Sequence, residues 1–211
     1  MTVASQTVAD SGYRVVVGLG ATGLSCARFL WRRGIRFVIV DTRAHPPGLD
    51  ELRSEMPGVT VYAGEYPQDI IAAAEEVIVS PGVAMDAGVV VEAVAAGVDI
   101  VGDIDLFVRE ATAPVIGITG SNAKSTVTEL LGQMARDANM NAGVGGNLGT
   151  PALELLAPER ELYVLELSSF QLERAHDLNL QVATVLNISA DHLDRHGTMR
   201  RYRMAKHRIF N

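Results

Sequence analysis

Short runs of β-branched and other apolar residues alternate along the chain with longer stretches rich in alanine and leucine, and this alternation limits the possible folds most strongly. Strands that alternate with helices form parallel sheets covered by those helices. Runs that are apolar almost throughout fit such a sheet, because it is buried on both faces. We therefore predict an α/β fold with strands at residues 14–17, 37–40, 77–79, 115–118, 162–167 and 182–186.

The 211 residues, of which 48% are hydrophobic, are enough to build two modest domains. A break falls between Gly102 and Ala113. Before it lies a unit that opens with a glycine-rich turn, and after Pro114 a second strand leads into a second turn of the phosphate-binding type. We predict a Rossmann-like parallel-sheet domain over residues 1–105, followed by a P-loop-type α/β domain over residues 106–211.

Charge and composition exclude several classes of protein. The net charge is −7 and no run of Lys or Arg is present, which argues against sequence-independent nucleic-acid binding. The most apolar region, residues 77–108, is interrupted by acidic residues, so no membrane helix is expected. The N-terminus has no signal-peptide core, and the single cysteine, Cys26, reads as a small packed thiol. We expect a cytoplasmic protein that binds small molecules.

The first glycine-rich turn has the spacing G-x-G-x-x-G, with Gly18, Gly20 and Gly23 directly after a predicted strand and Asp41 at the end of the next. This pattern is typical of dinucleotide binding, in which the helix N-terminus accepts phosphates and the acid accepts a ribose hydroxyl. A uridine diphosphate would fit the same groups as well as NAD. Alternatively, the glycines only allow close packing of helix and strand. The turn at 80–82 is expected on the same edge of the sheet.

The second turn reads TGSNAKST from Thr119 to Thr126 and matches a nucleotide-triphosphate loop only in part. A strict P-loop has glycine where this chain has Ile118 and Ala123. The chemistry is nevertheless suitable, since Lys124 can bind phosphates and the hydroxyls after it can hold Mg²⁺. If position 123 needs a positive φ, alanine costs about 1–2 kcal/mol. If it needs a close phosphate approach, the β-carbon intrudes on the ligand.

Three later features point to the same place. Glu166 ends the strand in LELSSFQ, and His192 follows the strand before NISADHLDRH. The glycine-rich segment around Asn147 reads as a loop whose backbone approaches something closely. In a parallel sheet, Lys124, Glu166 and His192 would face one crevice. Taken singly, Lys124 could be a solvated residue at a helix start, Glu166 a surface acid and His192 a loop histidine. A buried carboxylate such as Glu166 is costly unless it meets a cation.

With these residues in place, the chain resembles the Mur ligases, ATP-dependent amide ligases of peptidoglycan synthesis, and most of all those that add D-glutamate. The resemblance spans residues 15–210. Two of its segments, LELSSFQLE and DHLDRH, are highly specific. In full, the matching segments are GLGATGLS, DTRAHPPGL, SPGVA, GDIDLF, TGSNAKSTVTELL, GVGGNLGTPAL, LYVLELSSFQLE, LNISADHLDRH and RYRMAKHRIF.

The resemblance implies a role for each matching residue. The substrate UDP-N-acetylmuramoyl-L-alanine would be bound by Ala21, Thr22, Asp41, Thr42, Arg43, Gly82, Asn147, Ser168, Gln171 and His192. ATP would be bound by Gly120, Ser121, Asn122, Ala123, Lys124, Ser125 and Thr126. Mg²⁺ would be held by Ser125, Glu166 and His192 with help from Lys206, a lysine that is carbamylated in the family, and Lys124, Glu166, His192 and Lys206 would be catalytic. Without the resemblance, Lys206 would be assigned to the solvated face of a basic helix.

The implied reaction transfers the ATP γ-phosphoryl group to the alanyl carboxylate and lets the amine of D-glutamate attack the acyl phosphate. Family members are about twice this length and have three domains, of which the C-terminal one recognises the amino acid. We therefore expect only part of the ATPase domain here, without the C-terminal domain. The chain alone is then expected to be an inactive monomer that takes D-glutamate only if the C-terminal domain is supplied. The alternatives are a non-catalytic UDP-sugar-binding module and, less favoured, an NAD-dependent oxidoreductase.

Overall fold

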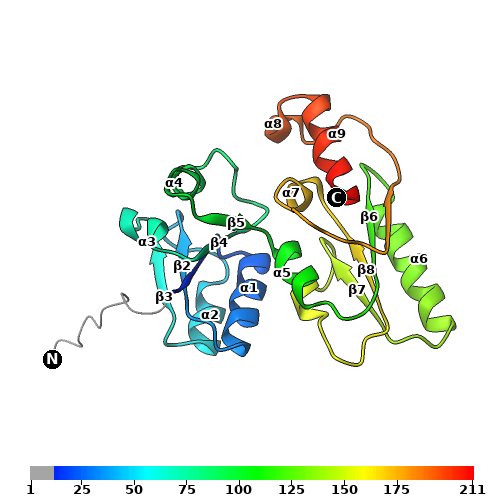
Figure 1. Cartoon of the computed structure of the whole chain (residues 1–211), viewed down its shortest axis with the longest axis horizontal. Coiled ribbons are helices and arrows are strands. Elements are labelled where there is room, and N and C mark those ends of the chain that lie inside the picture. Colours follow the sequence, from blue (N-terminus) through cyan, green and yellow to red (C-terminus); the bar gives the residue numbers. More distant parts are fainter. Residues whose placement is uncertain (1–11) are drawn as a thin grey trace.

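The computed structural model describes residues 12–211, and it consists of two parallel sheets wrapped by helices (Figure 1). This confirms the predicted α/β fold. The absence of a signal-peptide core was predicted for a segment that lies mostly at residues 1–11, outside the described part. No helix within residues 12–211 is both long and apolar enough to cross a membrane.

The first sheet has five parallel strands in the order β3-β2-β1-β4-β5. β1 lies at its centre, and its Val17 pairs in register with Val40 of β2 and Val79 of β4. The order reverses direction at β1, which is where open α/β sheets bind ligands. The elements are β1 (Arg14–Val17), α1 (Ala21–Arg32), β2 (Phe37–Asp41), α2 (Leu49–Glu55), β3 (Thr60–Ala63), α3 (Gln68–Ala72), β4 (Glu76–Val79), α4 (Gly88–Ala96) and β5 (Asp99–Val101).

Alternation along the central strands explains why helices cover both faces of this sheet. Val16 packs in a core with residues of α1 and α2, whereas Val15 and Val17 pack in a second core with residues of α3 and α4. Successive side chains of a strand point to opposite faces, so a continuous apolar run supplies both cores. Cys26 of α1 is buried in the first of these cores, as predicted.

The second sheet has four parallel strands in the order β7-β8-β6-β9. Its elements are α5 (Asp103–Glu110), β6 (Val115–Thr119), α6 (Lys124–Asp137), β7 (Ala142–Gly146), η1 (Ala152–Glu154), β8 (Leu162–Glu166), α7 (Ser169–Leu172), β9 (Val182–Val185), α8 (Leu193–His196), α9 (Met199–His207) and η2 (Arg208–Phe210). β9 forms one edge, and within residues 12–211 it pairs only with β6. An unpaired strand edge can pair with another chain, so we predict that this edge favours aggregation.

The sequence predicted six of the nine strands that lie within residues 12–211, and the glycine-rich segment was partly misread. Residues 142–146 form the strand β7, not a loop. Its glycines are needed because neighbouring backbone crowds them: a β-carbon would lie 2.2 Å from the carbonyl oxygen of Thr150 at Gly145 and 2.4 Å from that of Glu166, in β8, at Gly146. The close approach that glycine permits is therefore to the protein itself.

The two sheets share a continuous apolar core. One cluster runs from Val16 and Leu30 through Phe107 of α5 to Tyr163 and Leu165 of β8. The helix α5 lies between the two sheets (Figure 1) and contains residue 105, where the domain boundary was predicted. A boundary between 105 and 106 therefore falls inside a helix that packs with both halves, and it remains a proposal.

Candidate functional site

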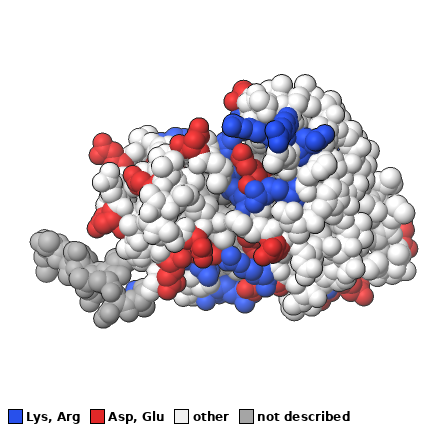
Figure 2. All heavy atoms as spheres, turned by 45° about the horizontal axis from the view of Figure 1, so that its top comes forward, with Lys and Arg blue, Asp and Glu red and all other residues white. Residues whose placement is uncertain are grey.

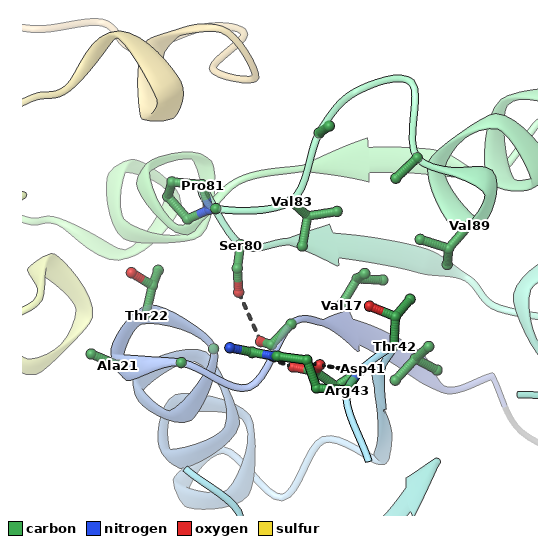
Figure 3. A pocket seen from close by; sticks show the side chains of 17 residues that line it. Val17, Ala21, Thr22, Asp41, Thr42, Arg43, Ser80, Pro81, Val83 and Val89 are labelled. Carbon is green, nitrogen blue, oxygen red and sulfur yellow. Dashed lines mark hydrogen bonds and ion pairs between the residues drawn. The ribbon is translucent and has the colours of Figure 1, made fainter. Parts of the chain in front are cut away.

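A cavity of about 530 Å³ opens at the carboxyl ends of β1, β2 and β4, at the reversal of strand order (Figure 3). It includes six residues of the predicted substrate site, namely Ala21, Thr22, Asp41, Thr42, Arg43 and Gly82. The remaining lining comes from the same loops and from the start of α4. The structure thus brings together the first glycine turn, the acid after β2 and the turn after β4.

The glycine turn combines both of the roles that the sequence left open. A β-carbon on Gly23 would lie 1.8 Å from the carbonyl oxygen of Gly18, so this glycine serves the packing of α1 on the loop. Gly20 is the N-cap of α1 and has nothing within 4 Å of a β-carbon position. Its helix has no acidic residue and no side-chain cap in the first turn. The amides of that turn are therefore free to meet an anion from the pocket.

Asp41 is buried beneath the pocket and already has partners. Its Oδ2 accepts hydrogen bonds from Leu19 N at 2.7 Å and Arg43 Nη2 at 2.6 Å, and its Oδ1 accepts from Arg43 N and Nε at 2.9 and 2.8 Å. Burial alone would raise the pKa of this carboxyl, but these hydrogen bonds outweigh it and hold the pKa below its usual value. Asp41 thus fixes Arg43 across the pocket floor (Figure 3). A ligand hydroxyl that binds Asp41 must share its carboxylate with Arg43.

The turn after β4 forms the opposite wall. Ser80 Oγ donates to the carbonyl oxygen of Gly18 at 2.8 Å and ties the two loops together (Figure 3). The carbonyl oxygen of Val83, in the same wall, accepts from Arg174 Nη2 and from Arg195 Nη2, the latter at 2.7 Å. Neither arginine was predicted from the sequence as a site residue, and both belong to the second half of the chain. On the face drawn in Figure 2, Lys and Arg side chains gather near the middle of the molecule, beside Asp and Glu side chains.

The second loop, between β6 and α6, carries Ala123 in the left-handed region, with φ 66° and ψ 7°. An L-residue pays a steric cost there that glycine does not. The loop is held on both sides: Asn122 N donates to Asn187 Oδ1 at 2.9 Å, and Ser121 Oγ lies 2.9 Å from Tyr202 Oη. Of the two sequence-level possibilities at position 123, the positive φ is confirmed.

Glu166 lies at the end of β8, directly beside the phosphate-type loop. Its Oε2 accepts from Ser125 Oγ at 2.7 Å and its Oε1 accepts from Asn147 Nδ2 at 2.8 Å. The residue is only 2% exposed, and two neutral donors satisfy its carboxylate, so burial does not by itself demand a cation. Carboxylate and hydroxyl oxygens are nevertheless ligands that Mg²⁺ prefers. The donor set of Ser125 and Glu166 fits that ion.

Lys206 is buried below the loop rather than solvated, which corrects the assignment that sequence alone favours. Its Nζ donates to the carbonyl oxygen of Gly120 at 2.8 Å and lies 4.7 Å from the ring centroid of Tyr202. Burial, and next the charge of Lys124, lower the pKa of this amine to about 8. The signal was present in the sequence, because the buried residues of this segment, Tyr202, Ala205, Lys206 and Ile209, follow a helical period.

The remaining predicted residues are placed differently. His192 is about half exposed, and among residues 12–211 the one carboxylate oxygen within 4 Å of its ring nitrogens is Asp191 Oδ2, 3.4 Å from Nε2. Gln171 is buried: its Oε1 accepts from Ser168 N at 3.0 Å and its Nε2 donates to Asp103 Oδ2 at 2.8 Å. Lys124 Nζ donates to Ser121 O, within its own turn, at 3.2 Å.

No three His, Cys, Asp or Glu side chains of residues 12–211 gather into a metal site. The structure therefore does not join His192 and Glu166 in a cluster of that kind.

Comparison with known proteins identifies both halves. Residues 13–102 match the MurD-like N-terminal domain of Mur ligases and residues 118–211 match the Mur ligase middle domain. The UDP-N-acetylmuramoylalanine–D-glutamate ligase of Pseudomonas aeruginosa is 57% identical over 203 residues, which are 96% of this chain and 45% of that protein. The ligase of the same name from Alcanivorax borkumensis is 50% identical, over 97% of this chain and 46% of that protein. The chain spans about half the length of these curated relatives.

Two solved structures share the fold. The UDP-N-acetylmuramate:L-alanyl-gamma-D-glutamyl-meso-diaminopimelate ligase from Neisseria meningitides has a TM-score of 0.61 at 18% identity, over 94% of this chain and 68% of that one. The UDP-N-acetylmuramate-alanine ligase MurC from Thermotoga maritima has a TM-score of 0.57 at 21% identity, over 93% and 46%. At these identities the likeness supports the fold alone.

Proposed function

The chain belongs to the Mur ligase family, and from that premise we propose that it is the substrate-binding and ATP-binding part of a ligase that adds D-glutamate to UDP-N-acetylmuramoyl-L-alanine. One observation carries the proposal. The buried Glu166, bonded to Ser125 and Asn147, stands behind a phosphate-type loop on one sheet, while a second anion-type pocket opens on the other. A ligase that activates a nucleotide-linked acid with ATP needs two such sites.

The first pocket is proposed to bind the UDP moiety. The diphosphate would meet the free amides at the start of α1, next to Ala21 and Thr22. Arg43, fixed by Asp41, supplies a positive charge at the pocket floor. Asn147, Ser168, Gln171 and His192 are proposed to contact the sugar and alanyl parts, although Gln171 already bonds to Ser168 and Asp103.

The second site is proposed to bind ATP with Mg²⁺. The backbone and side chains of residues 120–126 would hold the phosphates, with Lys124 as a positive charge close to them. Ser125 and Glu166 would hold Mg²⁺, which when bound neutralises charge on the transferring phosphoryl group. The parts of His192 and of a modified Lys206 in metal binding remain proposals. Lys206 is neutral more often than an ordinary lysine, as its lowered pKa indicates.

In the proposed reaction, the alanyl carboxylate attacks the γ-phosphoryl group of ATP and displaces ADP, which gives an acyl phosphate. The amine of D-glutamate then attacks the acyl carbon, displaces phosphate and loses a proton, which leaves the amide. The chain's own contribution is positioning and electrostatic stabilisation rather than covalent chemistry. We also propose that the incoming amino acid is D-glutamate, that the protein works in the cytoplasm and that it is a monomer.

Titration calorimetry with UDP-N-acetylmuramoyl-L-alanine, with an ATP analogue plus Mg²⁺, and with NAD tests the function. We expect heat of binding from the first two ligands and none from NAD. Binding of NAD alone would refute the proposal.

A second candidate is a module that binds the UDP-sugar without catalysis. The strained Ala123 in the phosphate loop favours it, because alanine in place of the usual glycine would weaken ATP binding and leave the first pocket unchanged. Binding of the UDP-sugar without any binding of the ATP analogue would support this candidate over the ligase.

A further inference from the structure

Two arginines from the second half of the chain hold the wall of the first pocket from outside. Arg174 follows α7 and donates from Nη1 to the carbonyl oxygen of Pro81 at 3.4 Å and from Nη2 to that of Val83. Arg195, in α8, donates from Nη2 to the same Val83 oxygen at 2.7 Å. Neither arginine lines the pocket. Both guanidinium groups end on the backbone of the segment that follows β4.

This arrangement is costly. Arg174 is only 2% exposed, and its Nε has no hydrogen-bond partner within residues 12–211. Burial, followed by the charge of Arg195, lowers the pKa of Arg174 to about 10. Glu173, which accepts from Arg195 at 3.2 Å, offsets part of the repulsion. Two like charges that converge on one carbonyl oxygen in a largely buried place differ from exposed ion pairs, which contribute little to stability.

The same two guanidinium groups also contact α7, which lies beside the second site. Arg174 Nη1 donates to the carbonyl oxygen of Phe170 at 2.7 Å, and the guanidinium of Arg195 lies 5.3 Å from the ring centroid of Phe170. Phe170 belongs to α7, which starts three residues after Glu166, and its ring lies 4.8 Å from that of His192. The arginines thus connect the wall of the first pocket with the segments that leave the second site.

We propose that Arg174 and Arg195 are positioning residues that hold the segment 81–84 in its ligand-binding conformation and thereby set the affinity of the first pocket for UDP. The inference rests on the proposed function of that pocket. Pro81, Gly82, Val83 and Ala84 all line the pocket, and both arginines bind the carbonyls on the outer side of this wall. Without them, the segment samples other conformations, and the apparent affinity falls in proportion to the competent fraction.

The test is the dissociation constant for UDP, measured by titration calorimetry on the full chain and on Arg174→Met, Arg195→Met and Arg195→Lys. If the competent fraction falls to about a tenth, both methionine variants bind UDP roughly tenfold more weakly. The lysine variant, which keeps a charged donor, recovers part of the loss. Arg208→Met is the matched control, because Arg208 donates to the carbonyl oxygen of Ala175 at 2.9 Å and does not touch the segment 81–84. It should bind UDP as the wild type does.

Thermal melting followed by circular dichroism establishes that each variant is folded. If Arg174→Met does not fold, the comparison of Arg195→Met with Arg195→Lys decides. A folded Arg195→Met variant with the UDP affinity of the wild type would overturn the inference and leave the proposed function intact. A wild-type chain that does not bind UDP at all would instead refute the proposed function of the pocket, and this inference with it.

Discussion

Replacement of Ala123 by glycine should stabilise the protein, because this residue has a backbone conformation that alanine tolerates poorly. Its φ of 66° places the β-carbon against the following carbonyl group, at a cost of about 1–2 kcal/mol. Glycine removes that cost but gives the unfolded chain more freedom, which costs about 0.4–1 kcal/mol. The net gain is about 0.5–1 kcal/mol in the free energy of unfolding. For a chain of this size, that raises Tm by roughly 1–4 °C.

Urea unfolding of Ala123→Gly and of the control Ala95→Gly measures this effect. Ala95 is an exposed residue of α4, and glycine there brings only the entropic cost, so the control should lose about 0.5–1 kcal/mol. The two variants are therefore expected to shift in opposite directions. If Ala123→Gly were destabilised as much as Ala95→Gly, the reasoning about the left-handed conformation would be refuted.

The same variant separates strain from contact with the ligand. If the β-carbon also intrudes on a phosphate, Ala123→Gly binds an ATP analogue more tightly than the wild type does. Calorimetry with the analogue and Mg²⁺ measures this, and we expect a gain in affinity with the fold unchanged. No gain would remove the idea that alanine at this position weakens ATP binding.

Three further predictions follow from buried groups. Gly23→Ala should lower the free energy of unfolding in urea by about 1–3 kcal/mol or more, because its β-carbon would meet the Gly18 carbonyl oxygen at 1.8 Å. The control Gly20→Ala should stay within about 0.5 kcal/mol of the wild type, and equal losses in the two variants would contradict the prediction. The pKa of the Lys206 amine is about 8 in the folded state and 10.5 in the unfolded state, so the folded state binds fewer protons between these pH values. The free energy of unfolding of the wild type should therefore rise with pH, relative to Lys206→Met, by up to about 3 kcal/mol across this window. Parallel curves of stability against pH would count against this prediction. Burial, opposed by the hydrogen bond from Gln171, raises the pKa of the Asp103 carboxyl from 3.8 to about 6. The folded state therefore binds more protons between these two pH values, and the stability of the wild type should fall relative to Asp103→Asn as the pH rises from 3.8 to about 6. A rise in relative stability would disprove the raised pKa.

Much of the fold could be predicted because its signals are local. The central strands are continuous apolar runs, and each phosphate-type turn follows its strand directly. Two of the three strands that were missed lack such a signal: β5 has three residues, and β7 reads AGVGG. The third, β3, reads TVYA and is short and partly exposed. Glycine is poor in β-propensity, so β7 is specified by its parallel pairing with β8 and not by its own composition.

The site was predictable where a residue type carries the chemistry and unpredictable where distant contacts set its environment. Ala123 departs visibly from the loop pattern, and the sequence therefore raised the correct question about its φ. Arg174 and Arg195 reach the carbonyl oxygen of Val83 from 91 and 112 positions away. Arg195 lies in the DHLDRH segment, but nothing local indicates that either arginine contacts Val83. The hydrogen bonds that satisfy Glu166 likewise come from other elements of the fold.

Hydrogen exchange of the chain with each ligand in turn tests the central claim, that two ligands occupy two separate sites at the edges of two sheets. UDP-N-acetylmuramoyl-L-alanine should slow exchange of backbone amides in residues 18–23, 41–43 and 80–84. An ATP analogue with Mg²⁺ should slow it in residues 119–126 and leave the first set unchanged. Protection of the same loop by both ligands, or of neither set by the UDP-sugar, would contradict the account.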